Sequence, residues 1–248
     1  MRILRLTILG CYGPYPGAGG ACSGYLLEDH STKILIDCGN GVLSKLFAYC
    51  NDLNKLDAIF ISHLHFDHMS DIFILRYAID IRQKLGQVQK SIPIYLPVSP
   101  QETFETIQYK ETYNINIIQA ESKIAINNIK VNFSMTNHPI ECYAMAFQSN
   151  KKRFVYSGDT RFYEGLIDFA NDSDLFLCEA SFPHRYLTDS VYHLSARQAG
   201  QIALRANVKK MILTHLLPDL DPHELLKEAG EEFGGNLEIA KEGKTYFI

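Results

Sequence analysis

Hydrophobic residues in the first half of the chain gather in short stretches that are typical of β-strands. Polar or glycine-rich segments separate these stretches, as at 10–23 and 29–32. Apolar residues also recur at helical spacing, at Ile72, Leu75 and Ile79. The pattern predicts strands at Ile3–Leu9, Gly24–Glu28, Lys33–Asp37, Asp57–Ile61 and Pro93–Leu96, and helices at Val42–Tyr49 and Asp71–Lys84.

The second half shows the same order, with strands first and helices later. A hairpin turn is expected at Asn127–Asn128, between two of the strands. The pattern predicts strands at Ile115–Gln119, Lys123–Ile126, Ile129–Thr136, Cys142–Gln148, Arg153–Tyr156 and Lys209–Leu213, and helices at Ser195–Ala206 and Pro222–Phe233. Two strand-rich halves, each followed by helices, predict an α/β fold in which two sheets pack face to face with helices outside. We therefore expect a four-layer αββα sandwich, formed by one domain over residues 1–248.

A histidine-rich motif follows directly after the predicted strand Asp57–Ile61. It reads His63-Leu64-His65-Phe66-Asp67-His68. Alternate residues that leave a strand project to the same side, so His63 and His65 can bind one ion while the following turn brings Asp67 and His68 to a second. The alternative is a surface turn with ordinary polar residues, but burying this many imidazoles together without an ion would leave their polar atoms unpaired.

Composition limits the setting in which this chemistry takes place. With 46% hydrophobic residues in 248, the chain can bury a substantial core, and its apolar runs are far shorter than a membrane span. The six cysteines form no C-x-x-C pair, which favours reduced thiols and a cytoplasmic protein. A net charge of −4 excludes a globally basic nucleic-acid binder, although a local basic patch would suffice for such a substrate. Composition does not decide between a monomer and a homodimer.

The motif and the strand residues before it, Ile59–Ser62, resemble the metallo-β-lactamase superfamily. The resemblance extends over nearly the whole chain and implies the αββα fold of that family. Leu35–Gly39 resembles the family's early strand that ends in Asp-x-Gly, whose aspartate is structural. By this resemblance Asp37 lies beneath the metal site and is not a ligand.

Three further residues match the family in the required order, namely His138, Asp159 and His215. Each follows a predicted strand, and a carboxylate such as that of Asp159 can bridge two cations. The ligands that the resemblance implies are His63, His65 and His138 at the first site, Asp67, His68 and His215 at the second, and Asp159 between them.

Nitrogen and carboxylate ligands of this kind suit Zn²⁺, and the oxygen-rich second site also suits Mn²⁺ or Fe. We therefore expect two divalent cations, with Zn²⁺ as the first choice. Such a pair holds a bridging hydroxide near neutral pH, which attacks a carbonyl or phosphorus centre. Asp67 would act in catalysis as well, by orienting this hydroxide.

Two segments point to phosphodiesters as substrates. Leu177–Phe182 resembles the His-Glu-Ala-Thr segment of ribonuclease Z, with cysteine in place of the histidine, and His193–Ala199 resembles its His-Ser-Thr-Ala segment, with Leu194 inserted. By this resemblance His193 is the general acid and Glu179 orients it. The alternative is that His193 only precedes a helix capped by Ser195. An aspartate at position 159, where the best-known β-lactamase class has a cysteine in the second site, argues against a true β-lactamase.

Only 20 residues separate His138 from Asp159, whereas ribonuclease Z carries a long arm for transfer RNA there. The sequence thus resembles an armless, ribonuclease Z-like phosphodiesterase, whose substrate is a small molecule or a short nucleic acid. The basic segment 151–153 is interpreted as a solvated turn. The alternatives are a hydrolase of carboxylic esters, thioesters, lactones or lactams and, less favoured, a non-catalytic binding module. The residues expected to form the pocket wall are Phe66, Phe182, Tyr186 and Leu216.

Overall fold

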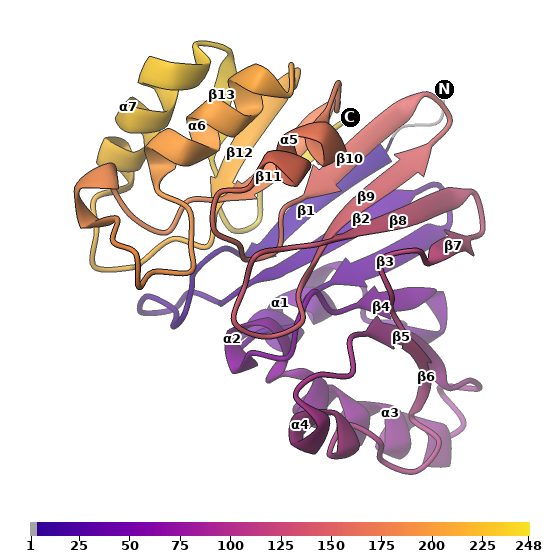
Figure 1. Ribbon diagram of the computed structural model, residues 1–248. Coiled ribbons are helices and arrows are strands. Elements are labelled where there is room, and N and C mark those ends of the chain that lie inside the picture. Colours follow the sequence, from indigo (N-terminus) through magenta and orange to yellow (C-terminus); the bar gives the residue numbers. More distant parts are fainter. Residues whose placement is uncertain (1–3) are drawn as a thin grey trace.

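The computed structural model describes residues 4–248, which form two seven-stranded sheets packed face to face with helices on both outer faces. Figure 1 shows the helices of the first half on one side of the sheets, and α6 and α7 on the other. The predicted four-layer αββα sandwich is therefore confirmed. Ile3, the first residue of the first predicted strand, lies outside the described residues.

The first sheet has the strand order β14-β1-β2-β3-β4-β5-β6. Pairing is antiparallel from β14 to β3 and parallel from β3 to β6. Its strands are β1 Leu4–Gly10, β2 Gly24–Asp29, β3 Thr32–Ile36, β4 Ala58–Phe60, β5 Ile92–Leu96, β6 Tyr113–Ile117 and β14 Thr245–Phe247.

The second sheet repeats this arrangement, with the order β13-β12-β11-β10-β9-β8-β7. Pairing is antiparallel from β7 to β10 and parallel from β10 to β13. Its strands are β7 Lys123–Ile126, β8 Ile129–Met135, β9 Tyr143–Ser149, β10 Lys152–Tyr156, β11 Leu175–Glu179, β12 Lys210–Thr214 and β13 Asn236–Ile239. Strands β8, β10, β11 and β12 consequently run in one direction, and their carboxyl ends meet at one edge.

The helices begin and end at recognisable sequence signals. Ser195 caps α6 through a reciprocal pair of hydrogen bonds with Gln198, and Asp221 caps α7 while Gly234 ends it in a left-handed conformation. The α-helices are α1 Val42–Tyr49, α2 Phe66–Met69, α3 Ile72–Lys84, α4 Gln101–Glu105, α5 Glu164–Ala170, α6 Ala196–Arg205 and α7 Pro222–Phe233, and the short 3₁₀ segments are η1 Leu53–Lys55 and η2 His184–Tyr186.

Two hydrophobic clusters hold the layers together. The larger fills the space between the sheets, where Phe60 packs against Phe133 and Phe147, and it continues beneath α5, α6 and α7. The smaller lies between the first sheet and helices α1 and α3, and includes Leu35 and Leu75. Each sheet is thus covered by apolar side chains on both faces, as expected for strands with uninterrupted apolar runs.

Most predicted elements are present, with ends shifted by a few residues. The hairpin turn is confirmed, since β7 and β8 pair on either side of Asn127, whose φ of 52° is left-handed. Strand β11 and helices α2, α4 and α5 were not predicted. Strand β11 lies in the middle of the second sheet and all of its residues are buried.

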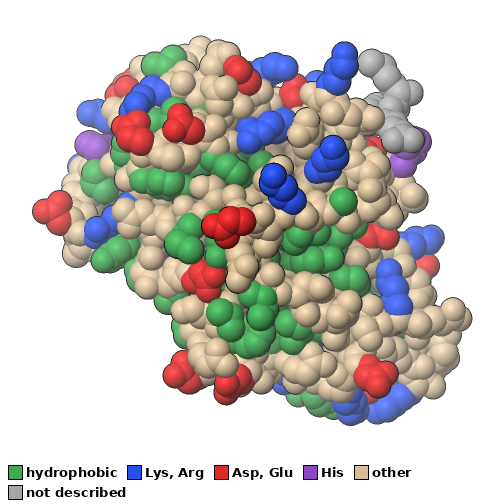
Figure 2. Space-filling view, turned by 45° about the vertical axis from the view of Figure 1, so that its right-hand side comes forward, with side chains coloured by type: hydrophobic (Ala, Val, Ile, Leu, Met, Phe, Trp, Pro, Cys, Tyr) green, Lys and Arg blue, Asp and Glu red, His purple; other side chains and the backbone are tan. Residues whose placement is uncertain are grey.

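The surface of the described residues carries charges of both signs. Figure 2 shows Lys and Arg side chains interspersed with acidic ones on one face, with hydrophobic side chains exposed between them. Among the residues that the structure describes, no helix is both long and apolar enough to cross a membrane.

Candidate metal centre

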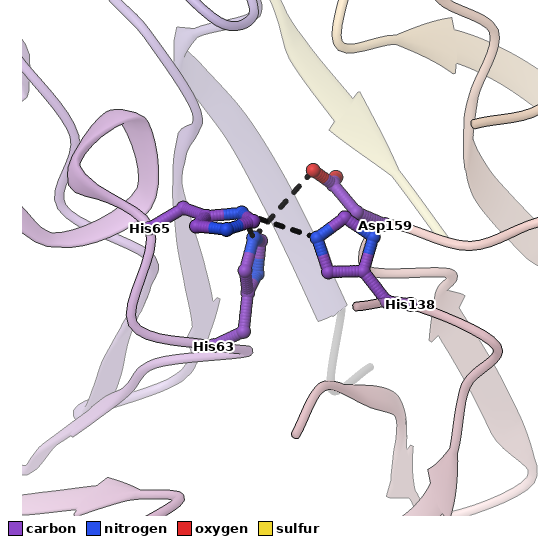
Figure 3. A group of neighbouring side chains, drawn as sticks. All are labelled: His63, His65, His138 and Asp159. Carbon is purple, nitrogen blue, oxygen red and sulfur yellow. Dashed lines mark hydrogen bonds and ion pairs between the residues drawn. The ribbon is translucent and has the colours of Figure 1, made fainter. Parts of the chain in front are cut away.

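Three histidines and an aspartate meet where strands of both sheets end. His63 and His65 follow β4 of the first sheet, whereas His138 follows β8 and Asp159 follows β10 of the second. Figure 3 shows their ring nitrogens and carboxylate turned toward one another. His65 Nδ1 lies 2.9 Å from His63 Nε2 and 3.1 Å from His138 Nε2, and His63 Nε2 lies 3.6 Å from Asp159 Oδ2. These four residues form the first group.

A second group shares the same aspartate. His68 Nε2 and His215 Nε2 each lie 3.3 Å from Asp159 Oδ2, and His215 Nε2 lies 3.1 Å from Asp67 Oδ2. Within each group, one donor atom per residue lies within 4.8 Å of all the others. The structure thus brings all seven predicted ligands together and places Asp159 between the two groups.

Buried atoms in this cluster indicate what it could hold. Among the described residues, His68 Nε2 and Asp159 Oδ1 are buried without a hydrogen-bond partner. Such atoms are costly to bury unpaired, and both are potential metal ligands. The close approach of three imidazole nitrogens in the first group is also unfavourable without a shared cation or proton. The donor set of imidazoles and carboxylates therefore fits two divalent cations.

Asp37 explains why His68 presents Nε2 to the cluster. The fully buried carboxylate of Asp37 accepts hydrogen bonds from His68 Nδ1 at 2.7 Å, from the Tyr156 hydroxyl at 2.8 Å and from both the amide and the hydroxyl of Ser62. A histidine that donates from Nδ1 keeps its Nε2 lone pair free for a metal. Asp37 therefore lies behind the cluster, where the family resemblance places it.

Burial also sets the protonation of the first group. It lowers the pKa of His63, His65 and His138, the last to about 4, so that these rings are neutral and their lone pairs available at neutral pH. Burial raises the pKa of Asp159, but the imidazoles of His215 and His68 outweigh this effect and hold its pKa well below the usual range. The first group is therefore in the form that binds a cation, with neutral imidazoles and an ionised carboxylate. In the second group burial lowers the pKa of His68, but Asp159, Asp67 and Asp37 outweigh this and raise it well above the usual range, so a cation would displace a proton there.

Glu179 and His193 form a pair beside the second group. His193 Nδ1 lies 3.2 Å from both Glu179 oxygens and 3.8 Å from Asp159 Oδ2. Burial lowers the pKa of His193, but Glu179 more than offsets this and raises the pKa to about 9. Glu179 is fully buried at the end of β11 and also accepts a hydrogen bond from the Thr160 amide at 2.6 Å. The pair can therefore hold a proton next to the cluster. Ser195 also caps α6, so a role of His193 as a proton donor is compatible with its place just before a capped helix.

Two further contacts were not anticipated from the sequence. The Ser181 hydroxyl lies 3.0 Å from Glu179 Oε2 and 2.9 Å from His215 Nδ1, and so joins the pair to the second group. A Cβ atom on Gly13 would lie 2.0 Å from His215 Nε2, so only glycine fits against this ring. The sequence shows the glycine-rich loop and Ser181, but it does not show that both contact His215.

The predicted pocket-wall residues fall into three cavities. Phe66 lines a cavity of about 360 Å³ together with Asp67, Asp159, His193 and His215. Phe182 and Tyr186 line a neighbouring cavity, whereas Leu216 faces a separate one behind the glycine-rich loop.

Comparison with known proteins identifies relatives over the full length of the chain. Residues 32–216 match the family described as the beta-lactamase superfamily domain. The probable metallo-hydrolase YhfI of Bacillus subtilis is 36% identical over 241 residues, which cover 97% of this chain and 98% of YhfI. The crystal structure of YhfI superimposes with a TM-score of 0.95 at 34% identity, covering 99% of this chain and all of the YhfI chain.

Ribonuclease Z is a more distant relative. The enzyme of Myxococcus xanthus is 26% identical over 312 residues, which cover 99% of this chain and 98% of that protein. The short form of human tRNase Z shares the fold, with a TM-score of 0.75 at 19% identity and 98% coverage of both chains. The similarity to YhfI is thus stronger than the resemblance to ribonuclease Z on which the substrate prediction was based.

Proposed function

The chain belongs to the beta-lactamase superfamily and has the metallo-β-lactamase fold, and from this premise we propose that it is a dinuclear metal-dependent phosphodiesterase for cyclic or short nucleotide substrates. The more general part of this proposal, that the chain is a metal-dependent hydrolase, agrees with the name of its relative YhfI and with the two histidine and aspartate groups. Our addition is the proposal that the substrate is a phosphodiester.

The first cation would be held by His63, His65 and His138, the second by the residues of the second group, and Asp159 would contact both. When bound, two such cations provide Lewis acidity and lower the pKa of a bound water toward neutrality. The chain itself keeps the ligands in place through Asp37 behind His68 and Ser181 behind His215. Asp67 is well placed to orient a nucleophile, since its carboxylate lines the open cavity and contacts His215.

The observation that carries the proposal is the Glu179–His193 pair, in which Glu179 is fully buried and His193 is half-buried. His193 faces the same cavity as Asp67 and Asp159, and its Nδ1 is held by Glu179. Its Nε2 is therefore free to donate a proton to a leaving group in that cavity. Alkoxide leaving groups, such as the ribose oxygen of a nucleotide diester, need such a proton, whereas a thiolate leaving group does not.

The fold also favours a small substrate. The 20 residues between His138 and Asp159 form the β9–β10 hairpin, which leaves no length for an arm in this part of the described chain. Two of the three residues of the basic segment 151–153 are engaged within the protein, because Lys152 contacts Asp174 and the Arg153 guanidinium donates to the carbonyls of Phe169 and Asn171. These contacts support a substrate that is recognised in the cavity rather than along the surface.

The proposal is tested with metal-loaded protein and a panel of substrates. We expect hydrolysis of bis(p-nitrophenyl) phosphate and of at least one cyclic or dinucleotide diester. A thioester, a lactone and a β-lactam, assayed under the same conditions, should be poorer substrates by kcat/KM. Turnover of a carboxylic substrate with no detectable phosphodiester cleavage would overturn the proposal in favour of a carboxylic ester or thioester hydrolase.

A further inference from the structure

A second cavity adjoins the candidate active site and shares its walls. It has a volume of about 420 Å³ and is lined by Pro14, His193 and His215, which also line the cavity that contains Asp67 and Asp159. Its remaining lining residues are Ser181, Phe182, Tyr186, Val191, Leu217 and Leu220. A group bound at the metal centre could therefore extend directly into this space, whose size suits part of a small molecule.

The chemistry of this cavity is almost entirely apolar. None of the described residues that line it is Lys, Arg, Asp or Glu. Its polar side chains already have partners: Ser181 contacts Glu179 and His215, His193 contacts Glu179 through Nδ1, His215 contacts Asp67, and the Tyr186 hydroxyl accepts from Arg185. Apart from His193 Nε2, in the wall shared with the first cavity, a phosphate chain or another charged group would find no charged partner here, whereas an apolar group would gain free energy by leaving water.

Two aromatic side chains line the cavity, one buried and one at its rim. Phe182 is buried, and its backbone pairs with Ser195 at the start of α6. Tyr186 is 49% exposed, but the Arg185 guanidinium lies 4.6 Å from its ring centroid and is itself paired with Glu224. An aromatic ring at the rim of an apolar cavity is suited to pack against a flat hydrophobic group.

We propose that this cavity binds an uncharged aromatic or apolar substituent on the leaving group of the substrate. The assignment to the leaving-group side rests on the proposed function, because His193, the proton donor in that function, forms the wall between the two cavities. The substituent could be a nucleobase or a simpler aryl or alkyl group, since both present an apolar face.

Binding rather than turnover provides the test, using phenylphosphonate and methylphosphonate as probes. Both present the same anionic head group to the metal centre, and only the first carries a ring. Calorimetry on the metal-loaded protein, at a pH where both probes are dianions, should show phenylphosphonate binding roughly tenfold more tightly or better. Adenosine 5′-monophosphate provides a third arm, and tight binding of it that depends on Tyr186 would identify a nucleobase as the natural substituent.

Variants of the lining residues test whether the tighter binding of phenylphosphonate arises in this cavity. Tyr186→Ala should reduce the advantage of phenylphosphonate to roughly threefold or less, whereas Tyr186→Phe should keep it. Leu220→Asp, which places a charge in the cavity, should also abolish the advantage. Tyr77→Ala is the matched control, because Tyr77 lies on α3 and is 47% exposed, almost the same as Tyr186.

Equal binding of the two phosphonates to the wild-type protein would overturn this inference, and so would an advantage that survives both Tyr186→Ala and Leu220→Asp. If the protein cleaves phosphodiesters while the two phosphonates bind equally, only the cavity assignment fails. If the advantage is present and depends on Tyr186 but no phosphodiester is cleaved, the cavity assignment stands as a binding site and the proposed function fails.

Discussion

At the scale of single residues, the candidate centre depends on side chains that orient its histidines from behind. Asp37 contacts the far nitrogen of His68, Ser181 that of His215, and Glu179 that of His193. In each case one ring nitrogen is occupied and the other faces the cavity or the cluster. Such outer contacts fix the tautomer of a ligand or proton donor, and their loss typically weakens metal binding or activity.

Replacing His193 tests whether this residue donates a proton or has only a structural role. His193→Ala should lower kcat on a cyclic nucleotide by about 10²- to 10⁴-fold, because its alkoxide leaving group needs a proton. The loss on bis(p-nitrophenyl) phosphate should be roughly tenfold or less, since p-nitrophenolate leaves unprotonated. His223→Ala, at an exposed histidine near the start of α7, is the control for removal of an imidazole. Equal losses on both substrates would show that His193 does not act as the acid.

Gly13 should be intolerant of even one added carbon. Gly13→Ala would place a methyl group against the His215 ring, so we expect weaker binding of the second cation and loss of most activity. Gly17→Ala in the same loop is the matched control, because its Cβ would make ordinary contact with Pro218 at 3.4 Å. Metal affinity measured by competition with a chromophoric chelator checks this prediction, and equal affinities of the two variants would contradict it.

At the scale of secondary-structure elements, the centre is assembled by loops at one sheet edge. Strands β8, β10, β11 and β12 run in the same direction; Glu179 is the last residue of β11, and the loops after the other three carry His138, Asp159 and His215. The loop 187–193, which leads to His193, contains no helix or strand. Arg161, two residues after Asp159, fixes it through hydrogen bonds to the carbonyls of Val191 and Asp189, and lies over the Tyr192 ring at 3.7 Å.

Arg161 is accordingly expected to act as a positioning residue. Arg161→Ala should lower kcat on a cyclic nucleotide far more than on bis(p-nitrophenyl) phosphate, with metal content unchanged. In the His193→Ala background the same substitution should have little further effect, because both changes remove the same proton transfer. Additive losses in this double-mutant cycle would show that Arg161 acts independently of His193. Arg161→Lys should not restore the rate fully, since lysine cannot reproduce the forked contacts.

The sequence predicted elements and ligands where the local signal was strong. The motif at 63–68 can be recognised directly along the chain, whereas His138, Asp159 and His215 were implied by the family resemblance, since a single polar residue after a strand does not identify a ligand. Strand β11 is short, apolar and central, so it lacks the alternation by which strands are recognised. The contacts of Gly13 and Arg161 join segments tens of residues apart, and a single sequence carries no information on such pairs.

At the scale of the whole molecule, the cluster joins the two sheets. His63, His65, Asp67 and His68 follow β4 of the first sheet, whereas the other three proposed ligands follow strands of the second. Cations bound between them would link the two halves of the fold. Binding to the folded state alone then adds to the free energy of unfolding of the entire chain.

Metal removal should therefore lower the melting temperature. With free cation at 100 times its Kd, binding contributes about 2.7 kcal/mol. For a chain of this size that corresponds to roughly 5–10 °C, measured by calorimetry with and without a chelator. An Asp159→Asn variant, in which the shared carboxylate is lost, should show a smaller shift. An identical melting temperature with and without the chelator would indicate that no cation binds the folded state.

The most direct test of a two-cation centre is the number of metal ions per chain, measured by elemental mass spectrometry on protein dialysed after loading with Zn²⁺. We predict two ions per chain for the wild-type protein and about one for Asp67→Ala, because that substitution removes a ligand of the second site only. Tyr77→Ala, on the distant helix α3, should retain two. A wild-type protein with no bound ion, or a metal content that Asp67→Ala leaves unchanged, would contradict the dinuclear centre proposed here.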